Sequence, residues 1–200
     1  HLVFVGAPRR RDGGERDEHG PDAFAAISSS RCTNEDNFVF QKFTRTVMNT
    51  HSIDNCSRVC HSPSAFGLGK ALGTGAGTNS FEDVEHTKCI ILIGANPTEA
   101  HPVFGMRIKQ AVMKGAKLIS IDPRKTELAT LADVHLQLNP GSNVAVVNAL
   151  QHVVLRDKLV DDDFIQGHTI GFDTLWDEVK DCTPEWAEGI SNVPAALIED

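Results

Sequence analysis

The sequence predicts an α/β fold with a Rossmann-like parallel sheet and helices on both of its faces. Three short apolar runs have the length and composition of buried strands, and they lie at residues 89–93, 117–121 and 134–138. Amphipathic stretches that predict helices alternate with these runs, at 99–114, where Gly115 ends the pattern, and at 141–157, where Ser142 or Asn143 lies near the cap. Strands that alternate with helices in this way are typical of a parallel sheet built from βαβ units.

The rest of the chain is less regular. Residues 1–21 combine an arginine cluster with paired glycines and mixed charge, which predicts an irregular N-terminal segment. The run 23–30 predicts a short buried strand, and 34–50 predicts a helix that Asn34 can cap. We therefore expect one α/β region over 22–200, in three parts, which are 22–80, 81–160 and, with short amphipathic helices, 161–200.

The charge balance restricts the partners that the chain can have. The net charge is −8, from 19 basic and 27 acidic residues among 200. A nucleic-acid-binding domain usually shows a basic patch, so this balance argues against that class. No apolar run approaches the ~20 residues that a membrane-spanning helix needs, and the first residues lack the order of a secretory signal. These observations predict a cytoplasmic protein without a membrane segment.

Five cysteines occur at irregular spacing, which argues against a disulfide framework and against a four-thiolate zinc or iron–sulfur site. Cys89 opens an apolar run, so we expect it to be a small buried side chain. Cys32 and Cys182 carry no signal of their own.

The stretch NCSRVCHSPS, residues 55–64, contains the most informative pair, Cys60 and His61. Adjacent side chains rarely face one another, so a hydrolytic nucleophile with its base is a weak interpretation. A zinc site that uses Cys56, Cys60 and His61 remains open. Burial statistics for cysteine favour Cys56 as a small buried residue that supports the loop.

Small and polar residues follow each of the three predicted strands, at the edge where α/β sheets bind ligands. These are residues 94–97, 122–124 and 139–142. Asp122 is suited to accept a hydrogen bond from a ribose hydroxyl or a guanine edge. The glycine-rich run 67–77 is not a phosphate-binding loop, because Lys70 is followed by Ala71. We expect it to be a place where the backbone approaches another group closely.

Several motifs occur in an order that resembles one family. They include SSSRCTNEDNFVFQKFTRTVMNT, NCSRVCHSPS, GTGAGTNSFEDVE, ILIGANPTEAHPV and GAKLISIDPRKTELATLADVHLQLNPGSNVAVVNAL. Together they closely resemble the catalytic subunit of molybdenum- or tungsten-dependent formate dehydrogenase, within the molybdopterin oxidoreductase (DMSO reductase) family. The resemblance runs from about Glu18 to Asp200, and C-x-R-V-C-H-x-P-S is its most specific part.

The resemblance implies formate oxidation to CO2 at a molybdenum or tungsten centre that two molybdopterin guanine dinucleotides hold. It implies that Cys60 binds the metal as a thiolate and that His61 handles a proton beside it. A soft thiolate suits a sulfur-rich metal centre. The resemblance also implies a set of cofactor-binding residues, which are Arg31, Gly94, Asn96, Glu99, His101, Asp122, Pro123, Arg124, Gly141 and Asn143.

Some parts of the family pattern are missing from these 200 residues. The family's cysteine cluster for a four-iron, four-sulfur cluster and its linking lysine are absent, as are the arginine that binds formate and the C-terminal barrel. We therefore expect an interior fragment that is inactive alone, and a complete enzyme that passes electrons to iron–sulfur or flavin subunits. Two alternatives are a sibling oxidoreductase that acts on another small substrate and an inactive scaffold with the cofactor-binding fold.

Overall fold

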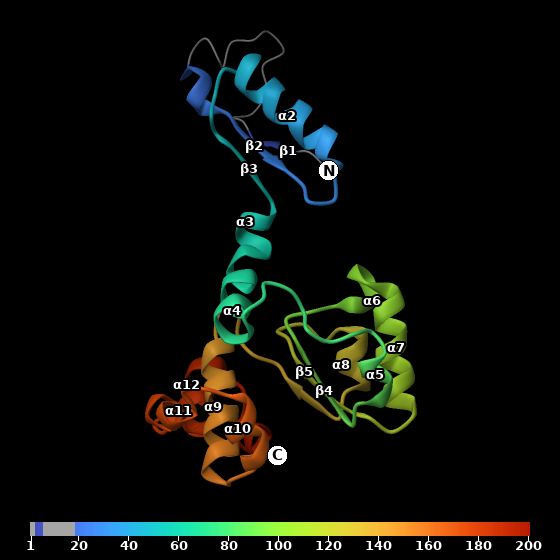
Figure 1. Ribbon diagram of the computed structural model, residues 1–200, viewed down its shortest axis with the longest axis vertical. Helices are drawn as coiled ribbons and strands as arrows, with labels where there is room; N and C mark the ends of the chain where they lie inside the picture. Colours follow the sequence, from blue (N-terminus) through green and yellow to red (C-terminus); the bar gives the residue numbers. More distant parts are fainter. Residues whose placement is uncertain (1–2, 6–18) are drawn as a thin grey trace. The chain divides into compact units, whose positions relative to one another are not determined.

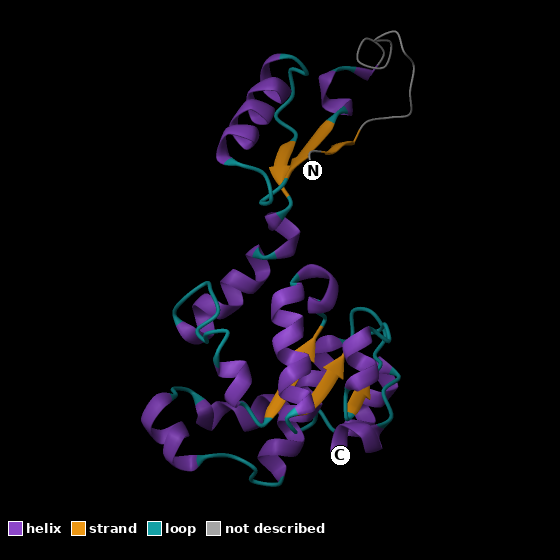
Figure 2. Ribbon diagram, turned by 90° about the vertical axis from the view of Figure 1, so that its right-hand side faces the viewer, coloured by secondary structure: helices purple, strands orange, loops and turns teal. Residues whose placement is uncertain are grey.

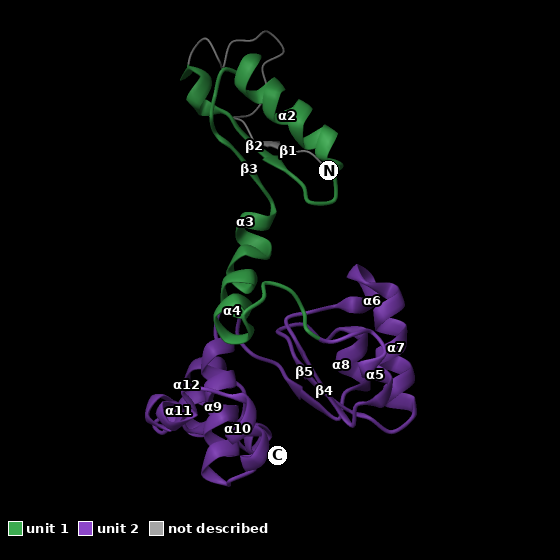
Figure 3. Cartoon of the chain, viewed as in Figure 1, with its two compact units in different colours: residues 1–78 green, residues 79–200 purple. Residues whose placement is uncertain are grey.

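The computed structural model describes residues 3–5 and 19–200. The chain divides into two compact units, residues 1–78 and residues 79–200 (Figure 3). Among the described helices, none has both the length and the apolar character needed to cross a membrane.

The first unit contains a three-stranded sheet. Its central strand β2 (Ala25–Ser28) pairs antiparallel with β1 (Val3–Val5) and parallel with β3 (Ile53–Asn55). The expectation that residues 1–21 are irregular is therefore wrong at β1, where three residues pair with β2. A short 3-10 helix, η1 (Pro21–Ala23), precedes β2, and residues 6–18 lie outside the described residues.

Helix α2 (Asn34–Thr46) contacts β2 and buries Phe40. Its cap is Thr33 rather than the expected Asn34. The Thr33 hydroxyl accepts from the Asp36 amide, and the Asp36 carboxylate accepts from the Thr33 amide, which forms a capping box. The helix ends four residues before the predicted boundary, because the backbone reverses at Asn49, whose φ is 57°.

Helices α3 (Ser57–Cys60) and α4 (Ser62–Leu72) follow β3, in a stretch that we expected to be a loop. Neither buries a side chain, so the apolar periodicity that marks most helices is missing. The left-handed backbone at Gly73, with φ of 75°, ends α4. A Cβ on Gly67 or Gly69 would meet nothing within 4 Å, so close approach does not explain these two glycines.

The second unit contains the predicted parallel sheet. Its order is β4 (Cys89–Ile93), β5 (Lys117–Ile121) and β6 (Val134–Leu136). Cys89 is in register with Lys117, and Ile121 with Leu136. The ribbon in Figure 2 shows these strands side by side with helices around them. Because all three strands run the same way, their carboxyl ends lie along one edge of the sheet.

Helices cover both faces of this sheet, as the sequence predicts (Figure 1). Leu118 of β5 lies in one core with Leu92, Ile108 and Leu128, the last two from α7 (Pro102–Met113) and α8 (Glu127–Leu131). Ile121, three residues further along β5, belongs to the core on the other face. That core includes side chains from α9 (Asn143–Arg156), α12 (Pro184–Ser191) and α13 (Ala195–Glu199). The remaining helices are α5 (Asp83–His86), α10 (Asp162–His168) and α11 (Phe172–Val179).

Three expectations for this unit need correction. The helix expected at 99–114 is two helices, α6 (Pro97–Ala100) and α7, because Pro102 has no N–H to donate to the turn before it. The last strand ends at Leu136 rather than at residue 138. Cys89 is exposed at the start of β4, which is an edge strand of the sheet.

Replacing Leu118 with alanine should lower the free energy of unfolding by about 2–5 kcal/mol, since Leu118 is fully buried and the smaller side chain leaves a cavity. Urea denaturation can follow this unit through Trp176 and Trp186, the two tryptophans of the chain. Met113, at 86% exposure, is the control. Met113→Ala should change the free energy by less than about 0.5 kcal/mol, and equal effects of the two substitutions would contradict this assignment of the core.

Arg156 connects the end of α9 to α13 by a bidentate ion pair. Its Nη1 and Nη2 lie 2.8 and 2.7 Å from the Glu199 carboxylate oxygens, and its Nε lies 2.8 Å from Asp157 Oδ1. The hydrogen bonds from Arg156 hold the pKa of both carboxyl groups below the usual range. The stabilisation is therefore present above the unfolded pKa values of about 4 and disappears as the pH falls through the lower folded values.

The substitution Arg156→Ala should accordingly lower the Tm at pH 7 and have a smaller effect as the pH is lowered below about 4. Calorimetry across this pH range checks the result. Arg45→Ala removes an exposed arginine that has no carboxylate partner among the described residues, and it should show no such pH dependence. A loss of Tm in Arg156→Ala that is the same at every pH would contradict the role of the two carboxylates.

Candidate functional site

Cys60 and His61 lie where α3 ends and α4 begins. Pro63 lies in the first turn of α4, where its missing N–H costs nothing, so a new helix starts there. At the other end of α3, Arg58 Nε donates to Asp54 Oδ2 at 2.9 Å. The Asn55 amide and then Arg58 lower the pKa of Asp54. Cys60 and His61 therefore lie at a defined junction between two helices rather than on an irregular loop.

The Cys60 thiol is exposed and makes no hydrogen bond within the described part of the chain. The neighbouring imidazole is fixed by the backbone, because His61 Nε2 lies 3.2 Å from the Gly75 carbonyl oxygen. A carbonyl can only accept, so Nε2 carries the hydrogen and Nδ1 of the neutral ring is left as an acceptor. The backbone of the glycine-rich run thus contacts the His61 ring at Gly75. The His61 ring is therefore one group that this backbone approaches closely.

Cys56 has a different environment from Cys60. Its sulfur accepts from the Ser30 amide at 3.5 Å and contacts the Ser30 hydroxyl at 3.6 Å. These bonds, the amide first, lower the pKa of the Cys56 thiol. Cys56 is half-buried rather than buried, and it attaches the start of α3 to the turn after β2. Arg31, which the sequence analysis places near a cofactor, lies exposed in that turn.

The described residues contain no group of three His, Cys, Asp or Glu side chains arranged to hold a metal ion. The Cys56 sulfur faces Ser29 and Ser30. The zinc interpretation with Cys56, Cys60 and His61 therefore has no support in the described chain.

In the second unit, two of the three turns at the carboxyl edge depend on glycine. Gly94, after β4, has φ of 56°, and its amide donates to the Ile121 carbonyl at 2.9 Å. Gly141, in the turn before α9, has φ of 89°. Both values lie in the left-handed region, which glycine adopts without steric cost. Ser142 closes this last turn by donating its hydroxyl to the Asn139 carbonyl at 2.7 Å, without capping α9.

The turn after β5 is organised by Asp122, which is 4% exposed. Its Oδ1 accepts from the Arg124 amide at 2.7 Å, and Arg124 Nε lies 3.8 Å from the same oxygen. The Thr126 amide donates to the Arg124 carbonyl at 3.0 Å, and Thr126 caps α8. The buried carboxylate thus holds a short turn that exposes the Arg124 side chain at the sheet edge.

A polar cavity of about 270 Å³ brings residues from two of these turns together. Its lining combines three residues that the sequence analysis identified with four that it missed, and they are Asn96, Thr98, Glu99, Arg124, Lys125, Thr126 and Glu127. Two buried polar atoms of the lining, Asn96 Oδ1 and Thr98 Oγ1, have no hydrogen-bond partner within residues 3–5 and 19–200. Buried polar atoms without a partner are rare, so they mark a place where a polar ligand would supply the missing bonds.

The lining of this cavity carries two cationic side chains, Arg124 and Lys125, and two carboxylates, Glu99 and Glu127. Glu127 is paired with Lys109 at 2.6 Å, and Asp122 is paired with Arg124. Lys125 has no carboxylate within ion-pair distance among the described residues. A lysine ammonium in this position is a common partner for phosphate oxygens.

The structure does not place every expected residue at this cavity. Pro123 lines a second polar cavity of about 610 Å³, with Asn139 and Pro140. Neither cavity is lined by Gly94, His101, Gly141 or Asn143. Of these, Gly94, Gly141 and Asn143 nevertheless lie at the same edge of the sheet. Thr98 and Lys125 had no signal in the sequence, since a threonine in a helix and a lysine in a turn are common. Their position became evident only from the cavity.

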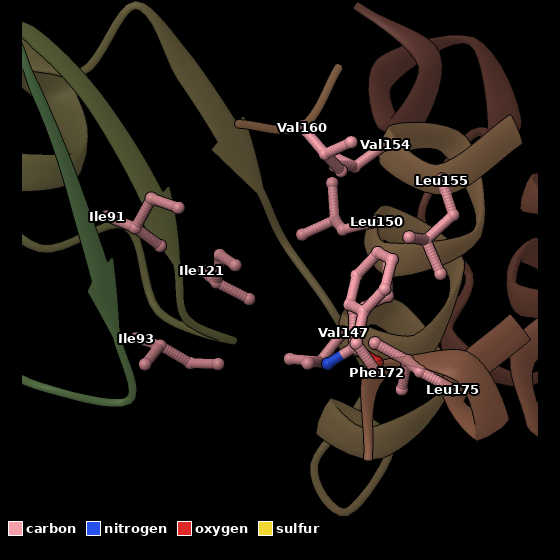
Figure 4. A pocket seen from close by; sticks show the side chains of 11 residues that line it. Ile91, Ile93, Ile121, Val147, Leu150, Val154, Leu155, Val160, Phe172 and Leu175 are labelled. Carbon is pink, nitrogen blue, oxygen red and sulfur yellow. The ribbon is translucent and has the colours of Figure 1, made fainter. Parts of the chain in front are cut away.

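A third cavity, of about 390 Å³, is apolar and lies on a face of the sheet (Figure 4). Ile91, Ile93 and Ile121 approach it from the strands. Opposite them, α9 and α11 supply leucine, valine and phenylalanine side chains, with Gln151 as the single polar residue of the lining. This cavity offers no titratable side chain, so it is a poor candidate for redox or proton chemistry.

The sequence matches one family. The family model described as molybdopterin oxidoreductase matches residues 14–193. The alpha subunit of F420-dependent formate dehydrogenase 1 from Methanococcus maripaludis is 47% identical over 185 residues, which is 92% of this chain and 27% of that protein. Formate dehydrogenase H from Escherichia coli is 41% identical over 184 residues, or 92% of this chain and 26% of that protein.

The fold has a solved counterpart in acetylene hydratase from Pelobacter acetylenicus, with a TM-score of 0.63 and 22% identity. That match covers 93% of this chain and 25% of the other. The chain thus spans about a quarter of the length of the curated relatives and of the solved structure that it matches.

Proposed function

The chain belongs to the molybdopterin oxidoreductase family, and from that premise we propose that it forms part of the catalytic subunit of a formate dehydrogenase. The reaction is the oxidation of formate to CO2, which releases one proton and two electrons. The observation that carries the proposal is the exposed, unbonded Cys60 thiol beside a His61 ring that the Gly75 carbonyl orients. Relatives 41–47% identical over nearly the whole chain are named formate dehydrogenases.

The residues present fit a molybdopterin-type cofactor. A soft thiolate such as that of Cys60 suits molybdenum or tungsten in a sulfur-rich site. The unpartnered atoms of Asn96 and Thr98, with Lys125 nearby, offer the bonds and the charge that a dinucleotide requires. We assign contacts with a pterin guanine dinucleotide to the residues of the sequence analysis, which are Arg31, Gly94, Asn96, Glu99, His101, Asp122, Pro123, Arg124, Gly141 and Asn143.

Cys60 would hold the metal to the chain as a thiolate, and the bound metal centre would supply the two-electron acceptor that formate oxidation needs. His61 takes the proton at Nδ1, because Nε2 is bonded to the Gly75 carbonyl. Asp122 keeps the turn after β5 in the conformation that presents Arg124. We propose an iron–sulfur or flavin subunit as the electron-accepting partner, and a cytoplasmic location for the enzyme.

A segment exchange tests this proposal. The matching segment of the M. maripaludis alpha subunit is replaced with residues 16–200 of this chain, which gives the chimeric subunit. We expect it to contain stoichiometric molybdenum or tungsten and to reduce a viologen dye with formate. A folded chimeric subunit that contains metal but oxidises no formate would contradict the proposed substrate. Zinc in place of molybdenum or tungsten would contradict the proposed cofactor.

A further inference from the structure

The turn that carries Asp122 and Arg124 receives two hydrogen bonds, one from the neighbouring strand β6 and one from the residue directly after it. The main-chain ladder between β5 and β6 ends with the pair Ile121 and Leu136. It cannot continue through Pro123, which has no N–H. The carbonyls of Asp122 and Pro123 are nevertheless satisfied, and the donors are side chains rather than backbone amides.

These donors are His135 and Gln137. His135 Nε2 lies 3.0 Å from the Asp122 carbonyl oxygen, and Gln137 Nε2 donates to the Pro123 carbonyl oxygen at 3.0 Å. Because a carbonyl only accepts, His135 carries its hydrogen on Nε2. Two consecutive carbonyls of one turn are therefore bonded to two side chains, one in β6 and one directly after its last residue.

The two donors are themselves held in place. His135 lies in β6 and Gln137 directly follows this strand, and both side chains reach the same turn. Leu136, between them, is 1% exposed in the core that Ile121 shares, and Leu138 beyond them is 3% exposed. The strand is thus anchored on one side while its polar side chains hold the turn on the other.

We infer that His135 and Gln137 are positioning residues, which together form a clamp that keeps the turn 122–124 in the geometry that binds the nucleotide part of the cofactor. Asp122 constrains this turn from within, through the Arg124 amide, and the clamp constrains it from β6. Both side chains also line the polar cavity of about 610 Å³ next to the turn. The inference rests on the proposed function, since the clamp acts on residues assigned to cofactor binding.

The test uses the 200-residue chain with His135→Leu, Gln137→Leu and the double variant. Hydrogen exchange, measured by NMR, reports how well the Arg124 and Thr126 amides are protected, and calorimetry measures binding of GDP as a probe for the nucleotide. Each lost hydrogen bond should raise the exchange rate and the GDP Kd about 3- to 10-fold. Amides in the centre of β5 should keep their protection, which separates a loosened turn from general unfolding.

Two variants serve as controls. His135→Gln retains an amide donor of similar reach and should restore protection and affinity relative to His135→Leu. Gln110→Leu removes an exposed glutamine of α7 that makes no side-chain hydrogen bond in the described chain, and it should change neither measurement.

The outcomes separate the clamp from the proposed function. Unchanged exchange at Arg124 in the double variant would overturn the clamp, whatever the affinity for GDP. Faster exchange with an unchanged GDP Kd would overturn its role in binding. The proposed nucleotide site would be contradicted if the wild-type chain does not bind GDP, or if Arg124→Ala leaves its GDP affinity unchanged. In either case the exchange rates would still decide whether the clamp exists.

Discussion

The chimeric subunit with Cys60→Ser is expected to lose its molybdenum or tungsten and to reduce dye with formate more than about 100-fold more slowly. Removing a residue that only hydrogen-bonds to a metal ligand costs up to about 100-fold, and removing the ligand itself should cost more. The substitution exchanges a soft sulfur ligand for a hard hydroxyl that stays protonated near neutral pH. Cys60 is exposed and unbonded, so the change removes no contact within the described chain. Metal analysis and dye reduction measure the two effects.

Cys56→Ser is the matched control for this prediction. It makes the same exchange of sulfur for oxygen four residues away, and a serine hydroxyl can still accept from the Ser30 amide. We expect it to retain metal and activity. If Cys56→Ser and Cys60→Ser lose metal equally, the loss reflects damage to the segment 55–64 and not removal of a ligand. If Cys60→Ser keeps both its metal and its activity, Cys60 does not bind the metal.

Two strands of the second sheet were predictable because they are long enough to show an apolar pattern. The runs at 89–93 and 117–121 are the strands β4 and β5, with the same bounds. By contrast, β1 and β3 have three residues each, which is too short for a period to appear. Helix α4 was missed for another reason, since it buries nothing and contains Gly67 and Gly69, which disfavour helices.

The position of candidate site residues was predictable only where the order and direction of the strands decide it. Polar turns after parallel strands must lie at one edge, so Asn96 and Arg124 were expected together before their common cavity was known. The register between strands is not encoded in this way. His135 and Gln137 bond to carbonyls 13 and 14 residues earlier in the chain, and which strand faces which turn decides those contacts. The bond between His61 and Gly75 likewise depends on where the chain returns after α4.

The chimeric subunit with His61→Ala should retain its metal and lose about 10²–10⁴-fold in kcat, the usual contribution of a positioned proton acceptor. The metal remains because Cys60, not His61, is the proposed ligand. The KM for formate should change little, since the acceptor acts on a proton that is released during the reaction. Steady-state kinetics together with metal analysis separate this outcome from that of Cys60→Ser.

His61→Gln distinguishes proton transfer from packing. A glutamine amide can still donate toward the Gly75 carbonyl, but it cannot accept a proton near neutral pH. It should therefore be as slow as His61→Ala, whereas a purely structural role predicts that it recovers the activity. His51→Ala, at an exposed histidine of the same unit, should leave kcat unchanged. An NMR spectrum of the labelled imidazoles should show His61 with its hydrogen on Nε2, and a hydrogen on Nδ1 instead would contradict the assignment of Nδ1 as the proton acceptor.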